Sequence, residues 1–282
     1  MSPHKSKSFY LLVQCNDQPG IIHKLTEKIM RLQGNITEFD QVTTAEKFIC
    51  RIEFETTVAH SQEELHYVFA NFKTNYQAQV TIIDAKKDFK MAILVSKPQH
   101  CLAELLHQVS SGRIPVTVSM IISNHPDHKA LADYYNIDYH YLTITANDKQ
   151  EQQLIELVNQ HSDFLVLARY MQILSAQFIE NYNKDIINVH HSLLPAFKGS
   201  NPYQQAYDKG VKRIGATAHF VTQILDDGPI IEQDTVPINH RHAVDEIKQQ
   251  GALIEKKVLA ESCRLYAQHR IVRLKDRTII FR

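Results

Sequence analysis

The pattern of hydrophobic and polar positions changes character once along the chain, near residue 89. Before it, short strands with alternating apolar positions are interleaved with amphipathic helices. Beyond it, near-continuous apolar strands alternate with helices, and strands of that kind are usually buried on both faces of a parallel sheet. The pattern predicts two domains of different class, at residues 7–84 and 89–282, joined by a polar linker at 85–88.

The first domain has the predicted element order βαββαβ. Strands are expected over residues 9–14, 35–43, 48–54 and 78–83, and helices over 20–32 and 62–72. This order is typical of the ferredoxin-like fold, a four-stranded antiparallel sheet with two helices on one face. Asp17 stands where an N-cap of the first helix belongs, and Gly34 where its C′ glycine belongs.

The second domain has the pattern of a Rossmann-like α/β fold with a mostly parallel sheet. Its strands are expected over residues 91–95, 116–122, 139–145, 164–168 and 186–189, and crossover helices over 101–109 and 152–160. A long closing helix is expected over 244–269 and a terminal strand over 278–281. The domain is large enough to form its own core.

Composition excludes several classes of protein. Among 282 residues, Lys plus Arg and Asp plus Glu are 31 each, and the basic residues are scattered, so neither nucleic acid nor a membrane surface is an expected partner. No signal peptide or membrane span is recognisable. The four cysteines lie far apart, as in a reduced, cytoplasmic protein, and are interpreted as small core residues: Cys15, Cys50, Cys101 and Cys263.

Glycine is concentrated in one part of the second domain. Four of the eight glycines lie between residues 198 and 229, and glycines gather where backbone turns sharply or approaches a ligand. The buried strand before this stretch leads to Asn188 and His190, which should share a face at the carboxyl end of the sheet, where α/β proteins bind ligands. For this pair alone, ordinary local hydrogen bonding is the commoner explanation.

A second segment, residues 215–231, predicts a strand, then a loop with two adjacent acids, then a Gly-Pro exit. Asp226 alone would be interpreted as a turn residue. An amide, an imidazole and a carboxylate together are the groups that cleavage of an acyl group needs.

These segments resemble the folate-dependent formyltransferase family. The matching runs are Asn-Val-His-His-Ser-Leu-Leu-Pro at 188–195, Gly-Ala-Thr-Ala-His-Phe-Val-Thr at 215–222 and Leu-Asp-Asp-Gly-Pro-Ile-Ile at 225–231. The resemblance implies a formyltransferase-type catalytic domain with Asn188, His190 and Asp226 as catalytic residues. It also implies a folate site, whose residues are Arg169, Tyr170, Met171, Gln172, Ile173, Leu174, Val221, Thr222 and Leu225.

The folate segment has a simpler interpretation as well. A strand end followed by a helix start at Ser175 explains its apolar residues almost equally. Gln172 stands where family members often have arginine.

Three features favour the branch of the family that releases the formyl group to water. The N-terminal domain resembles an ACT domain, which that branch carries. The turn after the first strand of the second domain, residues 95–100, has no glycine and contains Pro98, so it is a poor cradle for the phosphate of an amine substrate. His191 stands where the ribonucleotide transferases have proline.

The resemblance therefore implies hydrolysis of 10-formyltetrahydrofolate to tetrahydrofolate and formate. This reaction balances the one-carbon folate pool and supplies formate for purine synthesis. No bound cofactor and no metal are expected, and water is the acceptor. Asn188 and protonated His190 would stabilise the developing oxyanion, and Asp226 would hold His190 charged and take a proton from water.

The ACT resemblance implies regulation as well. Glycine or methionine is the expected effector, bound between two such domains, so the protein is expected to be a homo-oligomer, a dimer or a tetramer. The implied regulatory residues are Asp17, Gly20, Ile21, Asn35 and Ile36. A domain that only holds subunits together is an alternative explanation of the same residues.

Other functions remain open at this point. A transferase would pass the formyl group to an amine, and a non-catalytic regulator would only bind folate or amino acids. A serine nucleophile at Ser192 lacks the strand-turn-helix context of a nucleophile elbow. His125, Asp127, His128 and His140 lack the usual zinc spacing and are interpreted as a solvated loop.

Overall fold

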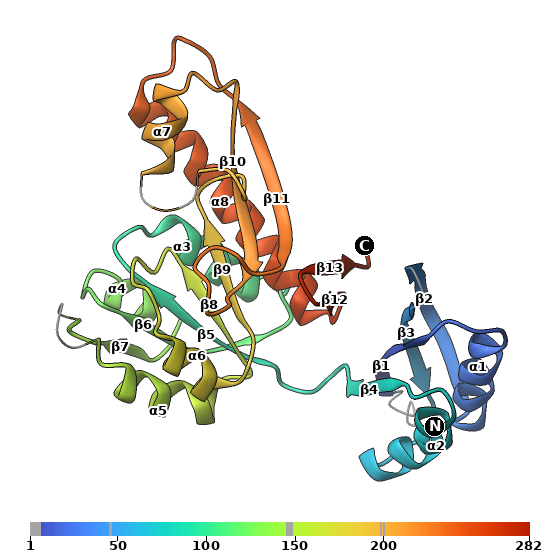
Figure 1. Ribbon diagram of the computed structural model, residues 1–282. Coiled ribbons are helices and arrows are strands. Elements are labelled where there is room, and N and C mark those ends of the chain that lie inside the picture. Colours follow the sequence, from blue (N-terminus) through green and yellow to red (C-terminus); the bar gives the residue numbers. More distant parts are fainter. Residues whose placement is uncertain (1–6, 45–46, 145–148, 198, 200) are drawn as a thin grey trace. The chain divides into compact units, whose positions relative to one another are not determined.

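The computed structural model describes residues 7–44, 47–144, 149–197, 199 and 201–282. The chain divides after Lys87 into two compact units, drawn in Figure 1. This break falls within the predicted linker. Among the described residues, no helix is long and apolar enough to cross a membrane.

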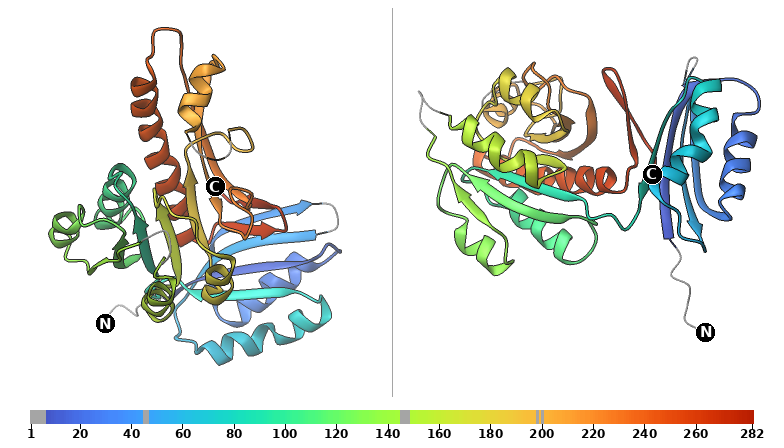
Figure 2. Two further views of the ribbon diagram at one scale, coloured as in Figure 1. Left: turned by 60° about the vertical axis from the view of Figure 1, so that its left-hand side comes forward. Right: turned by 90° about the horizontal axis from the view of Figure 1, so that it is seen from below.

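The first unit contains β1 (Lys7–Asn16), α1 (Ile21–Arg31), β2 (Gly34–Thr44), β3 (Lys47–Thr56), α2 (Gln62–Asn75) and β4 (Gln79–Asp84). The strands form an antiparallel sheet in the order β2-β3-β1-β4. Figure 2 shows both helices on one face of this sheet. Alternate residues of β1 are buried beneath the helices. The ferredoxin-like prediction is confirmed.

The two ends of α1 differ from the sequence prediction. Its N-cap is Gly20, which has φ 88°, and no side chain caps the helix, so Asp17 is not the cap. After the helix, Gln33 takes the left-handed conformation with φ 53°, whereas Gly34 begins β2. A Cβ at Gly34 would lie 2.8 Å from Cγ2 of Ile29, so this glycine is needed for close packing between helix and strand.

The second unit is built around a seven-stranded sheet in the order β11-β10-β9-β8-β5-β6-β7. Its strands are β5 (Lys90–Val95), β6 (Thr117–Ser123), β7 (Tyr139–Tyr141), β8 (Phe164–Ala168), β9 (Ile186–His190), β10 (Arg213–Phe220) and β11 (Ile230–Pro237). Strands β5 to β9 are parallel, and β10 and β11 are antiparallel additions. The predicted mostly parallel α/β class is confirmed.

Helices cover both faces of this sheet (Figure 1). They are α3 (His100–Ser110), α4 (Lys129–Tyr134), α5 (Glu151–His161), α6 (Ala176–Tyr182), α7 (Pro202–Asp208) and α8 (Val244–Ala267). Side chains of β5 alternate between two cores: Ile93 packs with residues of α3 and α8, and Leu94 with residues of α5 and α6. The strands are therefore apolar on both faces, as their sequences predict.

Some elements depart from the sequence pattern. Strand β7 ends at Tyr141 rather than near 145, and residues 145–148 lie outside the described residues. The short helices α4 and α7 and the strand β12 (Ile271–Leu274) were not predicted, because short elements carry too few periods to be recognised. Strand β11 was also missed, since its middle residues, Glu-Gln-Asp at 232–234, interrupt the apolar pattern. The predicted terminal strand is β13 (Arg277–Ile280), which pairs with β12.

The topology locates the position where a ligand is expected. From β5 the chain proceeds outward through β6 and β7, then returns to β8 on the other side of β5. Ligands of open α/β sheets bind outside the carboxyl ends of strands at such a switch point. Here the loops after β5 and β8 are tied together, since Ser96 N donates to Arg169 O at 3.2 Å.

Candidate active site

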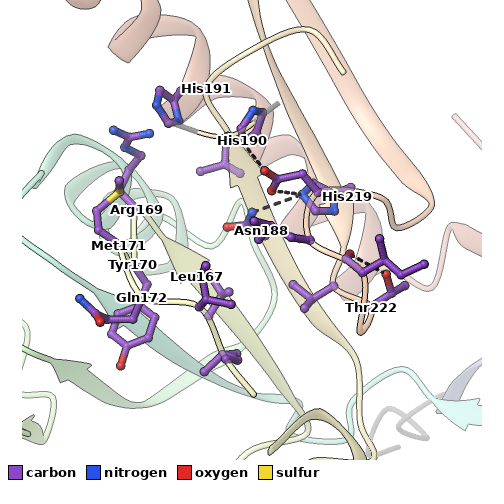
Figure 3. A pocket seen from close by; sticks show the side chains of 18 of the residues that line it. Leu167, Arg169, Tyr170, Met171, Gln172, Asn188, His190, His191, His219 and Thr222 are labelled. Carbon is purple, nitrogen blue, oxygen red and sulfur yellow. Dashed lines mark hydrogen bonds and ion pairs between the residues drawn. The ribbon is translucent and has the colours of Figure 1, made fainter. Parts of the chain in front are cut away.

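A cavity of about 410 Å³ opens at the carboxyl ends of β8 and β9. Asn188 and His190, two residues apart on β9, both line it, and the loop after β10 contributes Asp226. Figure 3 shows the side chains of Asn188, His190 and His219 close together on one side of this cavity. The structure therefore brings together Asn188, His190 and Asp226, the three residues that the family resemblance implies are catalytic.

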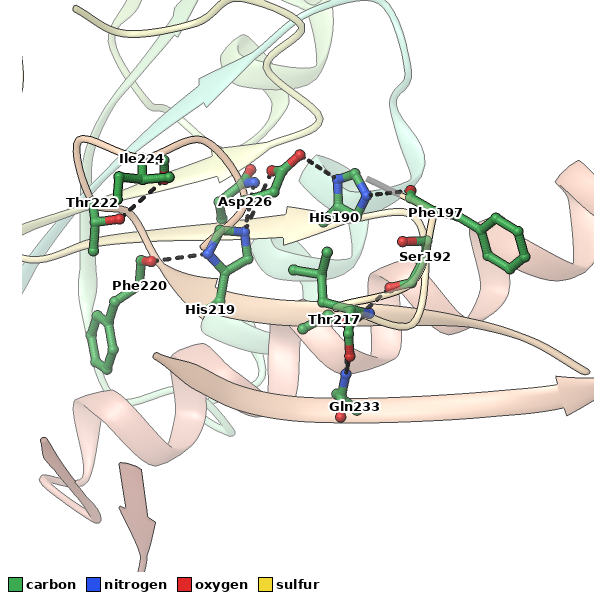
Figure 4. Close-up of polar contacts among 12 residues, drawn as sticks. His190, Ser192, Phe197, Thr217, His219, Phe220, Thr222, Ile224, Asp226 and Gln233 are labelled. Atoms are coloured by element: carbon green, nitrogen blue, oxygen red, sulfur yellow. Dashed lines mark hydrogen bonds and ion pairs between the residues drawn. The ribbon is translucent and has the colours of Figure 1, made fainter. Parts of the chain in front are cut away.

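His190 has an acceptor on each side of its ring. Its Nδ1 lies 3.3 Å from Oδ2 of Asp226, and its Nε2 lies 3.3 Å from the carbonyl oxygen of Phe197 (Figure 4). Only the doubly protonated imidazolium can donate to both. All three groups lie in a site where His190 is 5% and Asp226 9% exposed, so water screens these interactions weakly.

His219 supports this pair from β10. Its Nδ1 donates to the carbonyl oxygen of Phe220 at 2.9 Å, which leaves Nε2 as an acceptor for Nδ2 of Asn188 at 3.2 Å. Burial lowers the pKa of His219, with opposing contributions from the Phe220 carbonyl and Asp226. A neutral His219 therefore fixes which way the Asn188 amide faces.

Sequence reasoning did not assign a role to His219. The signal is the antiparallel pairing of β9 with β10, which sets His219 directly opposite Asn188. That register could not be read from the sequence, because strands β5 to β9 of the same sheet are all parallel.

The loop that carries Asp226 is held by a close backbone approach. Asp226 itself has φ 53°, a conformation that aspartate tolerates better than most residues. Two residues on, a Cβ at Gly228 would lie 1.7 Å from the carbonyl oxygen of Phe220. Only glycine permits the loop to return along the strand at this distance, and this return points Asp226 at His190.

All nine residues that the resemblance assigns to folate binding line the cavity. The segment Arg169–Leu174 follows β8, and the backbone N–H of Met171 donates to Ser96 Oγ at 2.9 Å. Met171, Ile173 and Leu225 are each more than half exposed. They form an apolar rim that a flat aromatic ligand could cover.

A cluster beside the cavity was missed by sequence reasoning. Glu255 of α8 is 2% exposed and pairs with Nε2 of His100 at 2.8 Å, the Tyr203 hydroxyl, and Nε of Arg169 at 3.3 Å. Burial alone would raise the pKa of Glu255, but His100, Arg169 and Tyr203 lower it to about 2. The four residues come from separate elements, so no local sequence pattern links them.

His191 lies next to this cluster. Burial, with the positive charge of Arg169, lowers its pKa to about 3. His191 is therefore neutral near pH 7, and it contacts the rings of His190 and Tyr203 at centroid distances of 5.2 and 5.6 Å.

The predicted regulatory residues do not all lie together. Asp17, Gly20 and Ile21 line a cavity of about 320 Å³ at the start of α1. Asn35 is exposed on β2, and Ile36 packs against the core of the first unit, so neither lines this cavity.

The histidines considered as metal ligands were expected to lie in a solvated loop, and this is wrong for His128. His128 is 3% exposed, and its Nε2 lies 2.7 Å from the carbonyl oxygen of Ser96. Among the described residues, the group spaced to hold a metal is His100, Cys101 and Glu255. The Arg169 guanidinium beside Glu255 opposes a cation there, and burial raises the pKa of Cys101 well above its usual value, which disfavours the thiolate.

Comparison with known proteins identifies the class of the second unit. Residues 89–263 match the family described as formyl transferase. A structure of glycinamide ribonucleotide transformylase 1 from Symbiobacterium toebii is 30% identical, with TM-score 0.66, and the match covers 71% of this chain and 97% of that one.

Other relatives match nearly the whole chain. Formyltetrahydrofolate deformylase of Synechocystis sp. is 43% identical, over 96% of this chain and 97% of that protein. The crystal structure of a formyltetrahydrofolate deformylase from Pseudomonas syringae is 34% identical with TM-score 0.94, covering 98% of this chain and 95% of that one. The chain therefore belongs to the formyltetrahydrofolate deformylase family, which confirms the resemblance seen in the sequence.

Proposed function

We propose that this protein hydrolyses 10-formyltetrahydrofolate to tetrahydrofolate and formate. The observation that carries the proposal is the meeting of an oriented amide, an imidazole with acceptors on both nitrogens, and a carboxylate at the wall of one cavity. Family membership supplies the substrate class. In the cell, the reaction balances the one-carbon folate pool and supplies formate for purine synthesis.

The folate lies in the 410 Å³ cavity along residues 169–174 and 221–225. The apolar rim covers its rings, and its formyl group reaches Asn188 and His190. The long Nε2 contact of His190 to the Phe197 carbonyl is the one that exchanges for the formyl oxygen. Asn188 Nδ2, held by His219, supplies the second donor to the oxyanion.

Asp226 acts on the attacking water. A water oxygen bonds to the formyl carbon while its proton passes to Asp226, directly or through a relay. The C–N10 bond then breaks, its electron pair stays on N10, and N10 takes up a proton. Formate leaves ionised, so one proton is released overall. No cofactor takes part in these steps.

The amine-transferase alternative has less support. Relatives with the transformylase name match about 71% of the chain or less, whereas deformylases match both units. The turn after β5, residues 95–100, lacks glycine and contains Pro98, which has no N–H to offer a phosphate. A phosphate cradle is therefore not favoured there.

The test is incubation of the purified protein with 10-formyltetrahydrofolate in buffer alone, following formate and tetrahydrofolate together. We expect equal release of both. Release that requires an added amine would identify a transferase instead, and folate binding without turnover would identify a regulator.

We further propose that the first unit acts as an ACT-type regulatory domain in a cytoplasmic homo-oligomer, a dimer or a tetramer. The cavity lined by Asp17, Gly20 and Ile21 supports an amino-acid effector, glycine or methionine. Assays with each amino acid, combined with mass measurement in solution, test this proposal. If neither amino acid changes the activity, the melting temperature or the mass, the first unit would be left only with the role of holding subunits together.

A further inference from the structure

A second cavity of about 400 Å³ adjoins the first. The two share Arg169, His191 and Asn201. The rest of the second cavity is lined by the cluster residues His100, Tyr203 and Glu255, and by Gln204, Lys248 and Ala252. In Figure 3, Arg169 and His191 lie beside each other at the end of the first cavity where His190 lies.

The position of the shared wall decides what the second cavity can do. When a folate fills the first cavity, water can no longer reach the formyl carbon through that cavity. The acceptor must then arrive from another side, next to His190. The second cavity borders the first at His191, the neighbour of His190 in the chain.

The charges in the second cavity are arranged for water rather than for a charged substrate. The Glu255 carboxylate is engaged by His100, Tyr203 and Arg169. Lys248, at the rim, pairs with Asp245 at 2.9 Å. An amine or a phosphate that reached Glu255 would have to disturb the pairs of this buried carboxylate, and a buried charge left without its partners opposes that.

Tyr203 is fixed in this arrangement by the helix beneath it. A Cβ at Gly251 would lie 2.0 Å from the Tyr203 hydroxyl, so glycine permits the ring to lie directly on α8. The hydroxyl then reaches Glu255 one turn further along the helix. This wall of the cavity is consequently a side chain packed directly against the helix.

We propose that the second cavity is the route by which the attacking water reaches the formyl carbon, and that the paired charges around Glu255 keep amines out of it. The inference rests on the proposed hydrolysis. It adds the path by which the acceptor, water, enters the site, which family membership does not specify for this chain.

The experiment narrows the cavity from Ala252, which is half-buried and belongs to neither the catalytic nor the folate-binding set. Ala252→Trp is expected to lower kcat for 10-formyltetrahydrofolate by about tenfold or more, with KM nearly unchanged, because water is displaced while the folate site stays intact. Ala252→Leu should give an intermediate loss. Leu253→Trp is the matched control, since Leu253 is 55% exposed and does not line the cavity.

Each outcome bears on one proposal. Wild-type protein that releases no formate would overturn the proposed function itself. An active wild type with unaltered kcat in the folded Ala252→Trp variant would overturn the water route, and so would a rise in KM alone. If the tryptophan variant does not fold, the leucine variant decides by the same criteria.

The exclusion of amines has its own readout. Glycinamide is added at high concentration to the active wild-type enzyme, and the products are separated. We expect formate alone, at an unchanged rate. Enzyme-dependent formation of N-formylglycinamide would show that the cavity admits an amine.

Discussion

At the scale of single residues, the geometry separates Asp226, the base in the proposed mechanism, from its neighbour Asp227. Its carboxylate is 9% exposed and lies 3.3 Å from Nδ1 of His190, whereas Asp227 is exposed and does not line the cavity. Asp226→Asn keeps the shape but removes the proton acceptor. We expect kcat to fall by about 10²–10⁴ with folding and KM largely preserved.

The matched control is Asp227→Asn, for which steady-state kinetics should give near-wild-type values. Near-normal kcat in the Asp226 variant, or an equal loss in both variants, would remove Asp226 from its role as the base.

His219 is a positioning residue in this scheme, since it acts through Asn188. In His219→Phe the acceptor for Asn188 Nδ2 is lost, and the amide can rotate away from the oxyanion. We expect kcat to fall by about tenfold to a hundredfold, less than the loss of an oxyanion donor itself. His219→Gln, which retains an acceptor, should recover part of the activity.

A pH profile separates this role from acid-base chemistry. The kcat/KM profiles of both His219 variants should keep the wild-type shape at lower height. A shifted limb would mean that His219 takes part in the acid-base chemistry, either by exchanging a proton itself or through Asp226, whose Oδ1 lies 3.8 Å from its Nε2. Equal activity of the phenylalanine and glutamine variants would contradict positioning through Asn188.

At the scale of elements, the loop between β10 and β11 depends on Gly228. A Cβ there would lie 1.7 Å from a backbone oxygen, which no rotamer change can relieve, so Gly228→Ala must move the loop. We expect a loss of stability of about 1–3 kcal/mol. We also expect kcat to fall in the variant that remains folded, because Asp226 is displaced from His190.

Gly112→Ala is the matched control. Gly112 has φ 74°, nothing lies within 4 Å of its Cβ position, and it lies outside both cavities. Its variant should lose some stability through backbone strain and keep its activity. Denaturant unfolding and kinetics on both variants provide the check. Full activity in Gly228→Ala would show that the loop tolerates displacement.

The same elements show what sequence patterns could and could not provide. The strand period of two put Asn188 and His190 on one face, and the family motif added Asp226. The antiparallel pairing that sets His219 opposite Asn188 joins distant segments, and the period of one strand does not show which strand lies beside it or in which direction. The cap at Asp17 failed for a related reason, since Gly20 takes a left-handed conformation that the helical pattern does not encode.

At the scale of the whole molecule, the residues around Glu255 are the clearest case of information that exists only in the fold. His100, Arg169, Tyr203 and Glu255 come from α3, the loop after β8, α7 and α8. Apart from Arg169, which the family resemblance assigns to folate binding, each looks like an ordinary surface or core residue in its own segment. Their meeting ties four elements of the second unit together beside the catalytic site, which gives the cluster a consequence for stability.

That consequence is a specific dependence of stability on pH. The pKa of Glu255 is lowered to about 2, because His100, Arg169 and Tyr203 outweigh the effect of burial. The folded state therefore favours the ionised carboxylate, and the stability gained is fully present above the unfolded pKa of about 4.3. It is lost as the pH falls from about 5 toward 2. Cys101, also facing this carboxylate, stays protonated throughout this range.

Glu255→Gln removes the charge with little change in volume. Near pH 7 we expect the variant to be less stable by about 1–3 kcal/mol, since His100 and the Tyr203 hydroxyl lose a charged acceptor and Arg169 loses its ion-pair partner. The difference from wild type should shrink as the pH falls from about 5 toward 2, because the unfolded wild-type chain takes up a proton at this carboxylate while the folded state keeps it ionised. Urea unfolding at several pH values measures it. A difference that stays constant or grows on acidification would show that the ionised carboxylate does not stabilise the fold, and that His100, Arg169 and Tyr203 are held in place by packing alone.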